Sequence, residues 1–262
     1  MVNDQPVLLD EPAPHVARLL LNRPDKRNAI DHAVREALTQ VLEALQGKSR
    51  IRALVIGGAG GFFSAGGDTP SMVGLTQAQA RERMRHIHRL CRALIGLRIP
   101  VVTAIEGMGV GAGVGLALLG DVIVVGPGTK IYFPFLKLGL IPDWGSLLTL
   151  PRRVGWPQAQ QLLAQSVTID GARACAIGLA DELAADDAVM QAAIDKAVEL
   201  AQLPQGAFAD MKRLLKPAPA EFARALQAEE DAQAELLQGA DFVEGYAAMR
   251  EKRKANFVRS AS

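Results

Sequence analysis

The sequence has few of the features that mark secreted or membrane-bound proteins. Only two cysteines occur in 262 residues, Cys91 and Cys175, and neither belongs to a CxxC pair, which favours a reducing compartment. The first residues carry acids and prolines where a secretory signal has a basic start and an apolar run. No apolar stretch reaches the roughly 18 residues of a membrane span. We therefore expect a cytoplasmic protein without a membrane partner.

An excess of charge of one sign is also missing. Lysine and arginine number 29 against 28 aspartates and glutamates, so no broad field exists to attract nucleic acid. His86 and His88 are two positions apart, and a helix would point them in different directions. With no HExxH motif and no Cys/His cluster, the sequence supports neither a metal site nor a nucleic-acid partner.

The hydrophobic pattern predicts an α/β fold, because strand-like segments alternate with helix-like ones in the first part of the chain. Asp31 is the expected N-cap of the first helix. Strands are expected at 15–21, 53–56, 101–105 and 121–125, and helices at 31–45 and 76–97.

From residue 156 the pattern becomes helical, which divides the chain into a core at 1–200 and a helical region at 201–262. Apolar faces such as that of Phe222 and Leu226 exceed what a small helical unit buries alone, so this region is expected to mediate oligomer contacts. Helices are expected at 157–164, 187–203, 222–237 and 243–252.

Two glycine-rich segments, 60–68 and 106–116, each follow a strand. Glycine lets the backbone turn sharply and approach a ligand, with N–H groups left free to donate. Two such turns are what an oxyanion hole of backbone N–H groups needs.

Two other interpretations of these segments are weaker. Ser64 would be a hydrolase nucleophile only in a GxSxG motif, and Phe62 stands where that motif has glycine. Residues 107–112 fit the GxGxxA pattern of dinucleotide-binding proteins, but no acidic residue ends the following strand.

Six segments resemble the enoyl-CoA hydratase/isomerase, or crotonase, superfamily, and together they span nearly the whole chain. The resemblance implies a crotonase-type ββα spiral core with a helical C-terminal region, an acyl-CoA substrate, no separate cofactor, and a homotrimer or a dimer of trimers. The segments are 21–24 with 28–29 (LNRP, NA), 63–68 (FSAGGD), 100–121 (PVVTAIEG onward), 138–143 (LGLIPD), 150–155 (LPRRVG) and 244–253 (EGYAAMREKR).

The resemblance also implies roles for individual residues. The backbone N–H groups of Gly67 and Ala112 would bind the thioester oxygen. Phe135 and Trp144 would either line an apolar or aromatic pocket or belong to the core. The residues expected along the CoA arm are Arg23, Lys26, Ala65 and Asp68, with Lys26 as a partner of its phosphates.

The chain departs from the family at the two catalytic glutamates of the hydratases. Gly115 and Phe135 stand at those positions, and neither can move a proton. Asp143 remains in a suitable place, and the stretch 133–143 most resembles the isomerase of phenylacetate breakdown. A single carboxylate that takes a proton from one carbon and returns it to another suffices for a double-bond shift.

The sequence thus predicts an enoyl-CoA isomerase with Asp143 as the proton shuttle. Two other functions stay open: an enoyl-CoA hydratase of fatty-acid or aromatic-acid degradation, and a catalytically weak acyl-CoA-binding subunit. The alternative role for Asp143 is to cap a helix that starts near Ser146.

Overall fold

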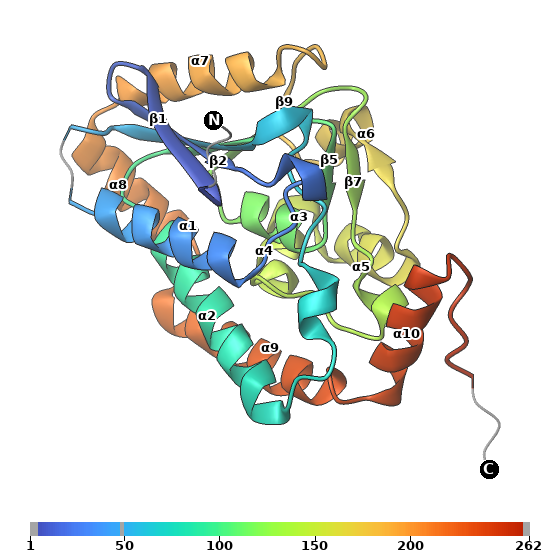
Figure 1. Ribbon diagram of the computed structural model, residues 1–262. Helices are drawn as coiled ribbons and strands as arrows, with labels where there is room; N and C mark the ends of the chain where they lie inside the picture. Colours follow the sequence, from blue (N-terminus) through green and yellow to red (C-terminus); the bar gives the residue numbers. More distant parts are fainter. Residues whose placement is uncertain (1–4, 48–49, 259–262) are drawn as a thin grey trace.

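The computed structural model describes residues 5–47 and 50–258 (Figure 1). Its main sheet has six strands in the order β1-β2-β3-β4-β6-β9, and all neighbours are parallel except β1 and β2. The strands are β1 (Val7–Ala13), β2 (Val16–Leu21), β3 (Ala53–Gly58), β4 (Val101–Ile105), β6 (Val122–Val125) and β9 (Glu182–Leu183).

A second, three-stranded sheet carries part of the site. Its strand β5 pairs parallel with β7, and β7 pairs antiparallel with β8. The strands are β5 (Met108–Val110), β7 (Lys130–Tyr132) and β8 (Ile169–Asp170).

The described chain also has ten α-helices and four short 3₁₀-helices, and the last four α-helices follow the final strand. The α-helices are α1 (His32–Leu45), α2 (Gln77–Ile95), α3 (Ala112–Leu118), α4 (Ser146–Val154), α5 (Trp156–Gln165), α6 (Gly171–Ala176), α7 (Val189–Ala201), α8 (Gln205–Leu215), α9 (Pro219–Leu236) and α10 (Ala240–Arg250). The 3₁₀-helices are η1 (Pro24–Lys26), η2 (Ala59–Gly61), η3 (Thr69–Met72) and η4 (Phe135–Leu138).

The central strands are buried on both faces, which explains their nearly continuous aliphatic sequence. Side chains alternate along β3: Leu54 and Ile56 pack with α1, α2 and α3, whereas Val55 packs with α7 on the opposite face. Figure 1 shows α7 on one side of the sheet and α1 and α2 on the other.

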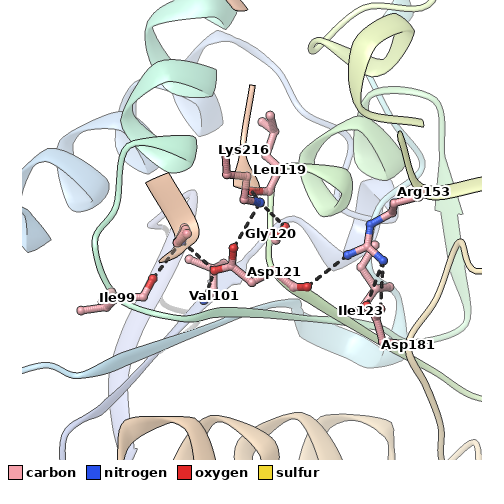
Figure 2. Close-up of polar contacts among 10 residues, drawn as sticks. Ile99, Val101, Leu119, Gly120, Asp121, Ile123, Arg153, Asp181 and Lys216 are labelled. Carbon is pink, nitrogen blue, oxygen red and sulfur yellow. Dashed lines mark hydrogen bonds and ion pairs between the residues drawn. The ribbon is translucent and has the colours of Figure 1, made fainter. Parts of the chain in front are cut away.

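A buried ionic cluster anchors α8 to the end of the sheet (Figure 2). Asp121 accepts a hydrogen bond from the N–H of Val101 at 2.9 Å and from the Nζ of Lys212 at 2.6 Å. The Nζ of Lys216 also donates to the carbonyl of Gly120 at 2.7 Å. These bonds satisfy the charges that packing of α8 removes from water.

The α/β prediction is confirmed, and so is the Asp31 cap, whose carboxylate accepts the N–H of Val34 at 3.0 Å. The prediction of helices alone after residue 156 is wrong at β8 and β9, because two-residue strands are too short to show a period. Helix α8 carries no alanine-rich pattern and was not expected. No helix within 5–47 and 50–258 has the length and apolarity to cross a membrane.

Candidate active site

The two glycine segments are held side by side by backbone pairing. The N–H of Ser64 donates to the carbonyl of Met108 at 3.1 Å, and the N–H of Val110 donates back to Ser64 at 3.0 Å. The first loop therefore runs along β5 like an extra strand. Gly66 has φ +92°, and a Cβ there would lie 2.6 Å from the carbonyl oxygen of Val110. Only glycine allows this close approach.

Gly67 and Ala112 follow the paired residues of the two segments along the chain, and both line a cavity of about 660 Å³. Within the described ranges, neither N–H group donates to a protein acceptor. Ala112 is the first residue of α3, so its N–H has no partner inside the helix. The geometry offers two unpaired donors at one cavity wall, which is the requirement for an oxyanion hole.

Asp143 lies in the same cavity on the turn between η4 and α4. It is 6% exposed, and its Oδ1 has no hydrogen-bond partner among the described residues. Helix α4 begins after Gly145, and no side chain caps it. The helix-cap interpretation of Asp143 is therefore wrong, and its carboxyl is available to a ligand.

Burial raises the pKa of the Asp143 carboxyl to about 7. The nearby carboxyl of Glu229 raises it further, whereas Arg83 and His88 act in the opposite direction. A group that titrates near neutral pH can both accept and return a proton, which is the property that acid–base catalysis uses.

Behind Asp143 lies a second buried pair, formed by Glu229 of α9 and His88 of α2. The Nε2 of His88 is 3.0 Å from the Oε1 of Glu229. Burial raises the pKa of Glu229 to about 8 and lowers the pKa of His88 to about 4. Both pKa shifts favour the uncharged form of the side chain. At neutral pH the Glu229 carboxyl is therefore protonated and the His88 imidazole is neutral, so the pair carries no net charge.

The two hydratase glutamate positions hold no acid, and the Gly115 position has no room for one. A Cβ on Gly115 would lie 2.6 Å from the Cβ of Trp144, so the indole-bearing residue occupies that space. Phe135 places its ring in the cavity wall. Of the described residues that line the cavity, Asp143 alone carries a carboxyl.

The remaining expected residues divide into two groups. Ala65 lines the cavity, whereas Trp144 is 1% exposed and lies in the core behind Gly115. Arg23, Lys26 and Asp68 are not among the lining residues. The guanidinium of Arg23 pairs with Asp31 at 2.8 Å, and Lys26 is exposed on η1.

Sequence reasoning missed the contribution of the C-terminal segment to the cavity. Lys254 and Phe257 line it together with Met249 of α10. Gln233 of α9 also lines it, and neither its spacing nor its type gave a signal. The basic character of 250–254 was the one available indication of an anionic ligand at the cavity.

Comparison with known proteins shows to which family the chain belongs. The family model for enoyl-CoA hydratase/isomerase matches residues 12–260. The chain belongs to this family. The "Probable enoyl-CoA hydratase" of Rhodobacter capsulatus is 33% identical over 250 residues, which cover 93% of this chain and 94% of that protein. The 1,2-epoxyphenylacetyl-CoA isomerase of Escherichia coli is 30% identical over 248 residues, with 93% and 95% covered.

Solved structures confirm the expected crotonase-type fold for this member of the enoyl-CoA hydratase/isomerase family. A crystal structure of an enoyl-CoA hydratase from Mycobacterium avium subsp. paratuberculosis superposes with a TM-score of 0.86 at 31% identity. It covers 97% of this chain, and this chain covers 99% of it. The predicted enzyme class is thereby confirmed at the level of the family.

Proposed function

We propose that this family member is an enoyl-CoA isomerase that moves a double bond within an acyl-CoA thioester. The observation that carries the proposal concerns the described residues of the cavity: Asp143 bears their single carboxyl and faces the same space as the N–H groups of Gly67 and Ala112, which donate to none of them. Hydration by a pair of glutamates is unsupported, because Gly115 and Phe135 hold those positions.

The proposed reaction balances with one carboxylate. The N–H groups of Gly67 and Ala112 donate to the thioester oxygen of a β,γ-enoyl-CoA, and Asp143 removes a proton from the α carbon. The electron pair of the broken C–H bond forms a double bond between the α carbon and the carbonyl carbon, while the carbonyl π electrons move onto the oxygen, which gives a dienolate. Asp143 then returns the proton to the γ carbon, which leaves the conjugated α,β-enoyl-CoA. Each oxyanion donor contributes about 3–4 kcal/mol to lowering the barrier.

The walls of the cavity support an apolar acyl group. Met72, Leu138 and Leu140 line it together with the ring of Phe135. Lys137 and Lys254 line it as well, and their charges suit the phosphates of CoA. The roles of Arg23, Lys26 and Asp68 along the CoA arm stay predictions.

Asp143→Asn tests the proposal, because it keeps the size of the side chain and removes the base. Turnover of a β,γ-hexenoyl-CoA, followed by the absorbance of the conjugated product, should fall by about 10²–10⁴. Binding of hexanoyl-CoA, measured by calorimetry, should stay near wild type, because the two amide donors are untouched. Unchanged turnover would refute the role of Asp143 as proton shuttle.

A hydratase is the second candidate, because relatives such as that of Rhodobacter capsulatus carry this name. Under our proposal, this protein hydrates crotonyl-CoA at least about 10²-fold more slowly than a two-glutamate hydratase does. Crotonyl-CoA hydration as fast as isomerisation would favour the hydratase. Absence of turnover with every enoyl-CoA, despite binding, would indicate the acyl-CoA-binding subunit instead.

We also propose a homotrimer or a dimer of trimers in the cytoplasm. Phe222 and Leu226 are buried within the single chain and give no support, contrary to the sequence-based expectation. The support is exposed apolar surface on other C-terminal side chains: Leu214 and Leu215 of α8 are 72% and 73% exposed, and Val243 of α10 is exposed as well. Such surfaces usually close into symmetric oligomers. Light scattering that finds a monomer at micromolar concentration would refute the assembly.

A further inference from the structure

The turn that carries Asp143 has an unfavourable backbone. Trp144 and Gly145 follow one another in the left-handed region, with φ of 60° and 70°. A bulky residue such as tryptophan rarely adopts this conformation unless its surroundings impose it. The turn therefore needs contacts from elsewhere in the fold to keep its shape.

Helix α9 supplies those contacts through Glu229 and Gln233. The Oε2 of Glu229 accepts the N–H of Gly145 at 2.9 Å. The amide of Gln233 accepts the N–H of Ile141 and donates to the carbonyl of Ile141, both at 3.2 Å.

Glu229 and Gln233 are four residues apart, so they share one face of the helix. Their contacts fall on both sides of Asp143 along the chain, at Ile141 and at Gly145. The two side chains thus hold the backbone at either end of the residue that lies in the cavity.

The carboxyl of Asp143 has no comparable support of its own. Its Oδ1 has no hydrogen-bond partner in the described ranges, so its direction depends on the backbone that bears it. Glu229 is itself held by the imidazole of His88 at 3.0 Å, and both side chains are 2% exposed. Glu229 does not line the cavity, which separates it from direct contact with a ligand.

We propose that Glu229 and Gln233 are positioning residues that aim the Asp143 carboxyl at the substrate, with His88 fixing Glu229. The inference rests on the proposed function, in which Asp143 moves the proton. Productive geometry is demanding, and a displacement of about 1 Å can cost about 10²-fold in rate.

Glu229→Leu and Glu229→Gln make the first comparison, with β,γ-hexenoyl-CoA as the substrate. Leucine fills the site but accepts no hydrogen bond, so kcat should fall about 10²-fold while KM stays within about threefold of wild type. The amide oxygen of glutamine accepts the N–H of Gly145, and its NH₂ donates to the imidazole of His88. Glu229→Gln should therefore keep most of the wild-type kcat.

Glu230→Leu is the matched control for helix docking. Glu230 is the next residue of α9, it is equally buried, and its carboxylate pairs with Arg85 of α2 at 3.1 Å. Its loss should lower Tm and leave kcat near wild type. Equal losses of kcat in Glu229→Leu and Glu230→Leu would overturn the proposal, and so would wild-type kcat in Glu229→Leu. Should Glu229→Leu not fold, Gln233→Leu takes its place; because Gln233 also lines the cavity, the positioning role requires that kcat fall while KM stays near wild type, and a raised KM with unchanged kcat would overturn it.

A double-mutant cycle separates this inference from the function on which it rests. In an Asp143→Asn background, Glu229→Leu should cause no further loss of kcat, because the group that it aims is gone. A further 10²-fold loss there would overturn the positioning role. Full turnover by Asp143→Asn alone would instead refute the proposed function, independently of any change at Glu229.

Discussion

Replacement of Gly115 by alanine adds one methyl group where α3 meets the turn that carries Asp143. The new Cβ would lie 2.6 Å from the Cβ of Trp144 and 3.0 Å from the Oγ of Ser146. The Cβ of Trp144 is fixed to the backbone and cannot swing away as the end of a flexible side chain would. Trp144 is also wholly enclosed by the core, so the turn itself must move.

The size of the effect follows from two opposing contributions. Excess volume in a packed core costs about 1–3 kcal/mol. The gain in helix propensity from glycine to alanine returns up to about 1 kcal/mol. Because the overlap involves a backbone-fixed atom, we expect a net loss of about 1–2 kcal/mol, which corresponds to about 2–8 °C in Tm for a chain of this length. Movement of Trp144 displaces its neighbour Asp143, so kcat should fall by about 10-fold or more.

Gly206→Ala is the matched control. Gly206 also lies in a helix, but no atom comes within 4 Å of a Cβ built there. Its Tm should stay the same or rise, with unchanged kcat. Thermal unfolding and β,γ-hexenoyl-CoA turnover of both variants make the measurement. A Gly115→Ala protein with wild-type Tm and kcat would refute the packing argument. Gly115→Glu should lose still more stability and should not gain hydratase activity.

Two other predictions concern pH and the CoA arm. Burial raises the pKa of Asp143 from 3.8 to about 7, so its carboxylate, the active base, forms as pH rises through 7, and kcat/KM should fall tenfold per unit below about pH 6. Because the pKa is higher in the folded than in the unfolded chain, the protonated carboxyl contributes to the free energy of unfolding. This contribution is fully present below about pH 4 and is lost as the pH rises from about 4 to 7. Asp143→Asn should therefore gain more Tm relative to wild type at pH 8 than at pH 5, and a wild-type profile without an acid limb near 7 would contradict the assignment. Lys26→Ala should raise KM for the CoA thioester and leave kcat near wild type, because it would contact only remote phosphates; a collapse of kcat with unchanged KM would exclude that role.

Local sequence determined much of the site. The two glycine segments predict unpaired backbone donors, and the family resemblance implies that the donors are the amides of Gly67 and Ala112. Gly115 and Phe135 stand where the resemblance places the two hydratase glutamates, and neither residue carries an acid. Asp143 was identifiable because it stands in a recognisable segment of the family. The alternation of buried strands and amphipathic helices likewise sufficed for the α/β class, while strands of two residues were too short to be seen.

Tertiary structure decided what depends on distances between remote segments. The pKa of Asp143 is set by burial beneath α2 and α9, which no local pattern around 143 contains. Glu229 and Gln233 look like ordinary polar residues of an amphipathic helix, and only packing brings them to the turn at 141–145. Trp144 resembles a pocket aromatic in sequence, yet the left-handed turn directs it into the core against Gly115. Sequence thus supplies the candidate groups of the site, and the packing of helices far apart along the chain sets their direction and their pKa values.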